Sequence, residues 1–210
     1  QLTTRYHNMN RIAQIFSLTG CLATLATAPL MGLQINEVRQ DEPGTTDSNE
    51  FVELVGEPGE SLDGLWYLVI GDHTAFGSDD GENIPDKRGG VVEFAVSLEG
   101  YSIPDDGHFL MTTADMQIDV FGLSVADVDF LLTEINFENG DNTTHVLVRG
   151  YTGIEVTNFA DQYDDLAVDI DDDEDGVPNA VLPWDEVIDA VGLVEVPNDS
   201  DPEEFVYGAA

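Results

Sequence analysis

Basic residues are scarce in this chain. Lys and Arg number 6 among 210 residues, against 43 Asp and Glu, so the formal net charge is −37. Beyond residue 32 the basic residues are Arg39, Lys87, Arg88 and Arg149. Binding to nucleic acid needs clustered Lys and Arg that displace counterions from the phosphates. The composition therefore excludes nucleic acid as a partner and disfavours anionic membrane surfaces. It suits cations, basic partners or a saline medium that screens self-repulsion.

An apolar run near the N-terminus contains no charged residue. The run covers residues 12–28, follows Arg11 and ends in small residues. This is the layout of a secretory signal peptide, and its start would be Met9. We therefore expect residues 1–32 to be a leader and residues 33–210 to form one secreted or surface-exposed domain.

Cysteine is almost absent, because Cys21 is the single cysteine of the sequence. Residues 18–21 (LTGC) resemble a bacterial lipobox, which would attach a lipid to Cys21 and so tie the protein to a membrane. The sequence stays apolar after Cys21, so simple cleavage is preferred over lipidation. In either case no cysteine remains beyond residue 32, and no disulfide can support the secreted domain.

Long periodic helical patterns are also missing. Short runs rich in β-branched and aromatic residues alternate with clusters of Gly, Pro, Asp and Asn, which is typical of an all-β domain. These runs also exclude disorder for most of the chain. Eight strands with few helices imply a sandwich of two sheets. The expected strands are residues 33–39, 50–56, 65–71, 91–97, 108–113, 144–150, 187–195 and 204–208.

Two of these runs predict how their strands are buried. Residues 65–70 (LWYLVI) contain no polar break and predict a central strand that is buried on both faces. The run VVEFAVS alternates with a period of two. Val92, Phe94 and Val96 should therefore share one face, with Glu93 on the other.

Other segments predict loops or short helices. Residues 73–90 are polar and predict a long loop, as do residues 151–183, which include the strongly acidic stretch 161–183. Loops of this length on a compact domain often carry function. Short helices are the alternatives considered for residues 124–134 and 183–190.

Four segments together resemble a known family, the bacterial lamin-tail domain (LTD). They are QINEV (34–38), DSNEFVEL (47–54), SLDGLWYLVI (61–70) and IPDDGHFL (103–110), and the resemblance covers residues 33–113. It implies an immunoglobulin-like β-sandwich in a secreted or cell-surface bacterial protein. Such domains serve in binding or adhesion, and the resemblance implies no catalytic residues.

The resemblance leaves more than one function open. It implies that Glu50 and Glu53 are structural and satisfy backbone groups at a strand end. The leading interpretation is a non-catalytic binding or adhesion module at the cell surface or in matrix. The alternatives are a secreted hydrolase with paired carboxylates, which 43 acidic residues leave room for, and a structural accessory domain of a larger extracellular protein.

The stretch DIDDDEDGVPNA is the strongest chemical motif. Alternate carboxylates followed by Gly resemble the first half of a calcium-binding loop, in which the side chains converge on one ion and Gly allows the sharp turn. We therefore expect calcium as the cofactor. The expected oxygen donors are Asp171, Asp173 and Asp175, the carbonyl of Val177, and Asn179, with Gly176 at the turn.

The motif departs from a complete calcium loop. Leu182 stands where a bidentate Glu would close the site, so Asp185 or Glu186 would have to reach back. An extracellular calcium turn tolerates this weakness, because such modules have dissociation constants of about 10⁻⁴–10⁻³ M. The competing interpretation is a solvated acidic loop that is extended by repulsion or that reflects a saline habitat. The position of Gly176 favours calcium.

Motifs for other chemistry are missing. The sequence contains no G-x-S-x-G, no P-loop, no G-x-G-x-x-G and no HExxH. His73, His108 and His145 lack the spacing of zinc ligands. Residues 79–83 (DDGEN) could hold a second ion, although a polar loop tip is the preferred interpretation.

Overall fold

The computed structural model describes a defined part of the chain. Residue 32 is the one described residue of the expected leader, so the expected signal peptide and Cys21 lie outside the described residues, as does the acidic segment 79–83. Among the described residues there is no helix long and apolar enough to cross a membrane. The described residues are 32–40, 50–74, 87–113, 127–133, 135, 137, 142–157, 168–173, 175–194 and 206–207.

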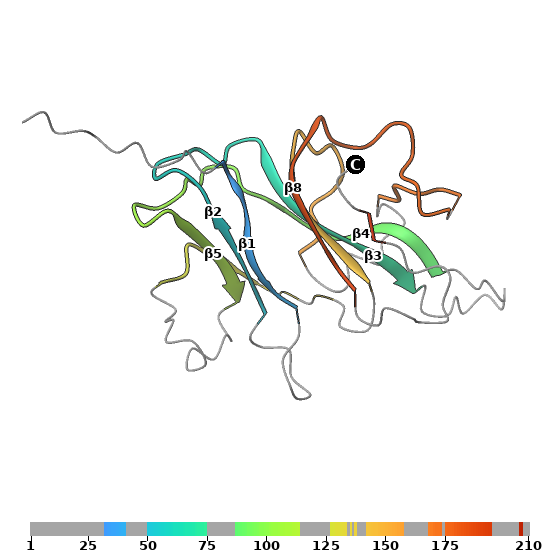
Figure 1. Ribbon diagram of the computed structural model, residues 1–210, viewed down its shortest axis with the longest axis horizontal. Helices are drawn as coiled ribbons and strands as arrows, with labels where there is room; N and C mark the ends of the chain where they lie inside the picture. The colour runs from blue at the N-terminus through green and yellow to red at the C-terminus, as the bar shows by residue number, and fades with distance from the viewer. Residues whose placement is uncertain are drawn as a thin grey trace, which may run out of the picture. The chain divides into compact units, whose positions relative to one another are not determined.

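The described residues form eight strands and no α-helix, so the architecture is all-β (Figure 1). The strands make two four-stranded sheets. The first sheet has the order β1 (Gln34–Arg39), β2 (Phe51–Val55), β5 (His108–Thr113), β6 (Phe130–Leu132). The second has the order β4 (Lys87–Ser97), β3 (Leu65–Thr74), β7 (Thr143–Arg149), β8 (Glu186–Leu193).

One main core joins the inner faces of the two sheets. The first sheet contributes side chains from β1, β2, β5 and β6, and the second contributes side chains from β3, β4 and β7. Burying one large apolar side chain of this kind contributes about 1.5–3 kcal/mol. Two layers around a shared core are consistent with a β-sandwich. The main core includes Val52, Leu54, Phe109, Met111, Tyr67, Val69, Phe94 and Leu147.

Strand β3 is buried on both faces, which confirms the expectation for a run without a polar break. Tyr67 and Val69 belong to the main core, whereas Leu68 and Ile70 belong to a second cluster on the opposite face of the sheet. All four side chains are at most 2% exposed. Because side chains alternate along a strand, each face of β3 needs its own covering layer.

The prediction of which side chains of β4 share a face is wrong for one residue. Phe94 and Val96 lie in the main core, but Val92 lies in the second cluster. The pairing of β4 with β3 skips Glu93, so a β-bulge reverses the alternation at that point. Glu93 is 8% exposed, and its carboxylate occupies the space that a Cβ at Gly71 would need.

Three other expectations are corrected. Residues 130–132 form strand β6, parallel to β5, where a helix was considered for 124–134. Strand β8 begins at residue 186, so residues 183–190 do not form a helix. The expected loop 73–90 is shorter, because β3 and β4 pair out to Thr74 and Lys87. Strand pairing decides each of these outcomes. Strand β8 also confirms the strand that was expected at residues 187–195.

The last expected strand, residues 204–208, falls mainly outside the described residues. Its described part, Val206 and Tyr207, is not in a strand. The N–H of Tyr207 nevertheless donates to Thr144 Oγ1 on β7, at 2.8 Å. The backbone of Tyr207 is therefore tied to the second sheet by a side chain of β7.

A histidine of β7 is buried beside the main core, against Tyr67 of β3. His145 is 0% exposed, and its Nδ1 lies 2.5 Å from the hydroxyl of Tyr67. Its Nε2 lies 3.2 Å from Gln40 Oε1, which also accepts a hydrogen bond from Thr143. The acceptor Gln40 Oε1 assigns the proton to Nε2, so Nδ1 accepts from Tyr67. Burial lowers the pKa of His145 to about 3, and the imidazole is neutral at pH 7.

This burial predicts acid sensitivity. In the unfolded chain His145 becomes protonated as the pH falls below 6.5. In the folded chain its low pKa keeps it neutral until about pH 3. The contribution of His145 to the free energy of unfolding therefore falls by up to about 1.4 kcal/mol per pH unit between these values. His145→Asn, which keeps an acceptor for Tyr67, should flatten the pH dependence of stability, measured by urea unfolding between pH 6 and 4.

Tyr67→Phe is the control for this prediction. It removes the hydrogen bond and keeps the imidazole, so it should lower stability at every pH and preserve the wild-type slope. A wild-type slope in His145→Asn would contradict the assignment of acid sensitivity to this buried ring.

Candidate metal centre

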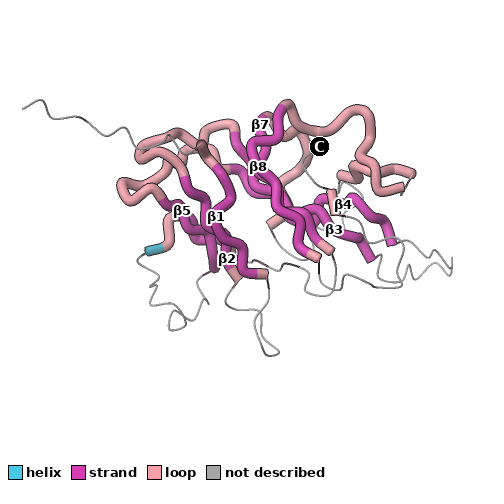
Figure 2. The backbone as a smooth tube through the Cα atoms, viewed as in Figure 1, coloured by secondary structure: helices cyan, strands magenta, loops and turns pink. Residues whose placement is uncertain are grey.

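The connection between β7 and β8 covers the outer face of the second sheet. Figure 2 shows most of this connection as loop. Its described residues bury apolar side chains against β3, β4 and β7 and form the second cluster, here called the outer cluster. The fully buried members are Leu68, Ile70, Val92, Ala95, Val146, Val148, Tyr151, Val156, Ile170 and Tyr207.

Part of this connection lies along the free edge of β4. Residues 168–171, here called the edge strap, meet β4 through two backbone hydrogen bonds. Val92 N–H donates to the carbonyl of Val168 at 2.8 Å, and Ile170 N–H donates to the carbonyl of Gly90 at 2.9 Å. The side chain of Ile170 is 1% exposed. The edge strap therefore positions the acidic turn that follows it.

The carboxylate of Asp171 anchors that turn. Asp171 is 0% exposed, although it is ionisable. Its Oδ1 accepts the N–H of Asp175 at 3.3 Å, and its Oδ2 accepts the N–H of Gly176 at 2.8 Å. The hydroxyl of Tyr207 also donates to Oδ2, at 2.9 Å. These donors offset the loss of water around a buried charge.

Two glycines allow this geometry. Gly176 has φ of +79°, a conformation that residues with a Cβ rarely adopt. Gly90 has φ of +89°, and a Cβ there would lie 2.8 Å from Asp171 Cβ and 3.0 Å from the hydroxyl of Tyr207. The absence of a side chain at Gly90 therefore lets Asp171 and Tyr207 meet beside β4.

The structure brings three of the expected metal ligands together. Asp171, Asp173 and Asp175 each offer a carboxylate oxygen, and these oxygens lie within 4.8 Å of one another. Asp173 and Asp175 are exposed, so an ion at this point would be reached from solvent. The spacing of two residues in the sequence therefore does produce a convergent set of oxygens.

The other two residues expected to supply donors take part in hydrogen bonds within the turn. The N–H of Val177 donates to Asp175 Oδ1 at 2.9 Å. Asn179 Oδ1 lies 3.4 Å from the N–H of Asp172, and Asn179 N–H donates to the carbonyl of Ile170 at 2.6 Å. Asn179 thus closes the turn, and its side chain is directed at the backbone.

Neither acidic residue that was considered for closing the site does so. Glu186 Oε2 lies 3.5 Å from Arg149 Nε, and Asp185 packs against Gly150. Leu182, at the position of the usual closing Glu, packs on the outer cluster. A cation at the three aspartates would therefore keep water ligands. Such an oxygen-rich, partly open set suits a weakly held Ca²⁺.

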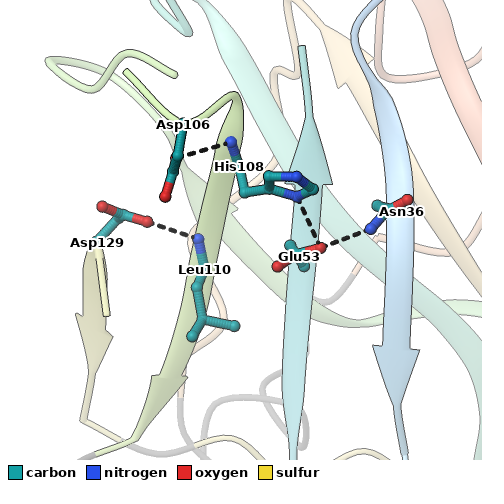
Figure 3. Close-up of polar contacts among 6 residues, drawn as sticks. All are labelled: Asn36, Glu53, Asp106, His108, Leu110 and Asp129. Carbon is teal, nitrogen blue, oxygen red and sulfur yellow. Dashed lines mark hydrogen bonds and ion pairs between the residues drawn. The ribbon is translucent and has the colours of Figure 1, made fainter. Parts of the chain in front are cut away.

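A second polar group lies on the first sheet (Figure 3). Glu53 Oε1 accepts a hydrogen bond from Asn36 Nδ2 at 2.5 Å and lies 3.0 Å from His108 Nδ1. Asp106 Oδ1 accepts the N–H of His108, and Asp129 Oδ2 accepts the N–H of Leu110. These contacts tie β1, β2, β5 and the approach to β6 together. Each carboxylate here has a structural partner.

The pKa of Asp129 is raised from its ordinary value. Loss of contact with water raises the pKa of Asp129, and the negative charges of Asp106, Asp127 and Glu53 raise it further. The N–H of Leu110 opposes this rise. Sequence reasoning missed this group, because its members are distributed between residues 36 and 129. Their residue types carry no motif.

The remaining residues singled out from the sequence do not converge. His108 is exposed and His145 is buried, whereas His73 lies on β3, where its backbone pairs with β4. Glu50 is 2% exposed, and its Oε2 accepts the N–H of Phe137 at 3.0 Å. Glu50 therefore satisfies a backbone group, as the structural interpretation of this residue expects.

Comparison with known proteins adds no relative. The chain matches no protein-family model, and neither a curated protein nor a solved structure is similar to it.

Two tyrosines test the anchoring role of Asp171. Tyr207→Phe removes the hydroxyl that donates to Asp171, and it should lower the free energy of unfolding by about 1.5–3 kcal/mol, as expected for a hydrogen bond to a charged group. Urea unfolding measures the change. An unchanged stability would show that this hydrogen bond does not hold the turn.

Tyr151→Phe is the matched control. The hydroxyl of Tyr151 is buried and has no hydrogen-bond partner among the described residues. Burial also raises the pKa of Tyr151 to about 12, so the group stays neutral. Removing an unsatisfied hydroxyl should leave stability unchanged or raise it.

Proposed function

We propose that this chain is a secreted, non-catalytic β-sandwich module that binds a partner at the cell surface or in matrix, and that a calcium ion at the acidic turn stabilises it. The observation that carries the calcium part is the convergence of Asp171, Asp173 and Asp175, with Asp171 held in place by Gly176 and Tyr207. The fold and the charge of the chain support the remainder.

The proposed fold is immunoglobulin-like and of the lamin-tail type. The four segments that carry this resemblance contain or adjoin β1, β2, β3 and β5. Strands β1, β2 and β5 are neighbours in the first sheet, and β3 is an inner strand of the second. The resembling segments therefore contribute to three strands of the first sheet and to one strand of the second, which supports the proposed fold.

Charge supports a binding role and limits the partner. With 43 acidic and 6 basic residues, the protein attracts partners that carry positive charge and repels polyanions. Surface carboxylates such as Asp105, Asp106 and Glu57 are exposed on turns of the domain. A basic protein segment or a cationic matrix component is therefore the partner chemistry that fits.

Calcium fits the acidic turn for three reasons. Carboxylate oxygens are hard ligands, which Ca²⁺ prefers. The three aspartates place their oxygens within 4.8 Å of one another, where their negative charges repel in the absence of a cation. Ligand sets that lack a closing carboxylate bind weakly, and extracellular modules work with dissociation constants of about 10⁻⁴–10⁻³ M.

Thermal unfolding tests the calcium proposal. At a Ca²⁺ concentration ten times the dissociation constant, binding should add about 1.4 kcal/mol to the free energy of unfolding. We therefore expect a higher Tm in millimolar CaCl₂ than in EDTA at matched ionic strength. Asp173→Asn should abolish this difference, because it removes one of the three ligands.

Asp105→Asn is the matched control, since it removes an exposed carboxylate from a turn next to β5. The variant should keep the full response to calcium. Equal Tm values in CaCl₂ and EDTA, or an identical response from Asp173→Asn and wild type, would refute the calcium site.

A further inference from the structure

We propose that the edge strap, residues 168–171, is a detachable cover on the edge of β4, and that screening by cations controls its docking. At high salt the strap lies on β4, and at low salt it is released together with the acidic turn. The proposal concerns general charge screening, for which Na⁺ suffices. It holds whether or not a calcium site exists.

Few contacts hold the edge strap in place. Its backbone makes two hydrogen bonds to β4, through Val92 and Gly90, and Ile170 is its buried apolar side chain. Asp171 adds the hydrogen bond from Tyr207. By contrast, β3 and β4 pair along nine residue positions. Segments with few contacts open locally at much lower cost than the sheets to which they are attached.

Charge opposes docking of the strap. Asp171 is buried at its end, and Asp172, Asp173 and Asp175 follow within one turn. The folded turn therefore gathers negative charge at the end of the docked strap, in a chain whose formal net charge is already −37. Like charges that are brought together in a partly buried site disfavour the compact arrangement.

The separation of the charges makes this repulsion sensitive to salt. The oxygens of Asp171, Asp173 and Asp175 lie within 4.8 Å of one another. The Debye length is about 10 Å at 0.1 M ionic strength and about 3 Å at 1 M. Repulsion across the turn is therefore nearly unscreened at low salt, and it is strongly reduced at 1 M for the exposed aspartates.

Release of the strap would expose part of a strand edge, the part at Gly90 and Val92, whereas Ala95 would keep its backbone hydrogen bonds to Val156. Strand β4 is the first strand in the order of its sheet, so one of its sides has no strand partner there. Without the strap, the N–H of Val92 and the carbonyl of Gly90 lose their described partners, and Ile170 leaves the outer cluster. Open strand edges are the sites at which further strands add to sheets. The salt concentration would thus decide whether this part of the edge is covered.

Amide hydrogen exchange tests the proposal. The full chain is kept in EDTA while NaCl is varied from low salt to about 1 M, where the Debye length falls to about 3 Å. The amides of Val92 and Ile170 report the strap, and those of the β3–β7 ladder report global unfolding. We expect protection of the strap amides to rise about tenfold or more with NaCl, while protection of the ladder amides changes less.

A charge variant supplies the second arm. Asp172→Asn combined with Asp173→Asn removes two exposed charges from the turn, so the strap amides should already be protected at low salt. Asp105→Asn combined with Glu57→Gln removes the same charge from distant exposed turns and should behave as wild type. Parallel changes in strap and ladder amides, no salt dependence, or equal effects of the two double variants would overturn the proposal.

The outcome is independent of the calcium experiment. If protection of the strap amides depends on salt in EDTA and CaCl₂ has no specific effect on Tm, the strap proposal is supported and the calcium proposal is refuted. If Tm depends on calcium and protection of the strap amides does not depend on salt, the calcium proposal is supported and the strap proposal is refuted.

Discussion

The burial of β3 on both faces is the constraint on which the rest of the structure depends. One face of β3, with Tyr67 and Val69, meets the first sheet across the main core. The other face, with Leu68 and Ile70, has no sheet against it and needs another covering layer. The connection from β7 to β8 supplies that layer. Its length is therefore explained by packing, because it must cross the sheet to bury this second apolar face.

The candidate metal centre follows from the same constraint. The covering connection ends its path across the sheet at the edge of β4, where Ile170 is buried and the chain must turn. Asp171 closes the turn through Gly176 and is held by Tyr207. The acidic turn is thus fixed next to the point where the backbone of the edge strap is tied to β4. The proposed cation binding and the proposed edge protection would both depend on how Asp171 is held.

Sequence reasoning succeeded where the determinant was local. The unbroken apolar run of β3 predicted burial on both faces, and the two-residue spacing of Asp171, Asp173 and Asp175 predicted their convergence. It failed where a distant partner decided the outcome. Strand β6 exists because residues 130–132 pair with β5, and Val92 changes faces because the bulge at Glu93 is set by pairing with β3. Pairing energy comes from the other strand, so a single strand's sequence does not encode it.

The amino-acid sequence by itself determined the all-β character, the excess of negative charge and the presence of a turn rich in carboxylates. These are properties of residue type and spacing along the chain. Tertiary structure alone decided that Asp171 is buried while Asp173 and Asp175 are exposed. That difference requires Gly90 from β4 and Tyr207 from near the C-terminus, which meet Asp171 beside the sheet. The physical reason is that a buried carboxylate needs donors and space, and here residues far away in the sequence provide both.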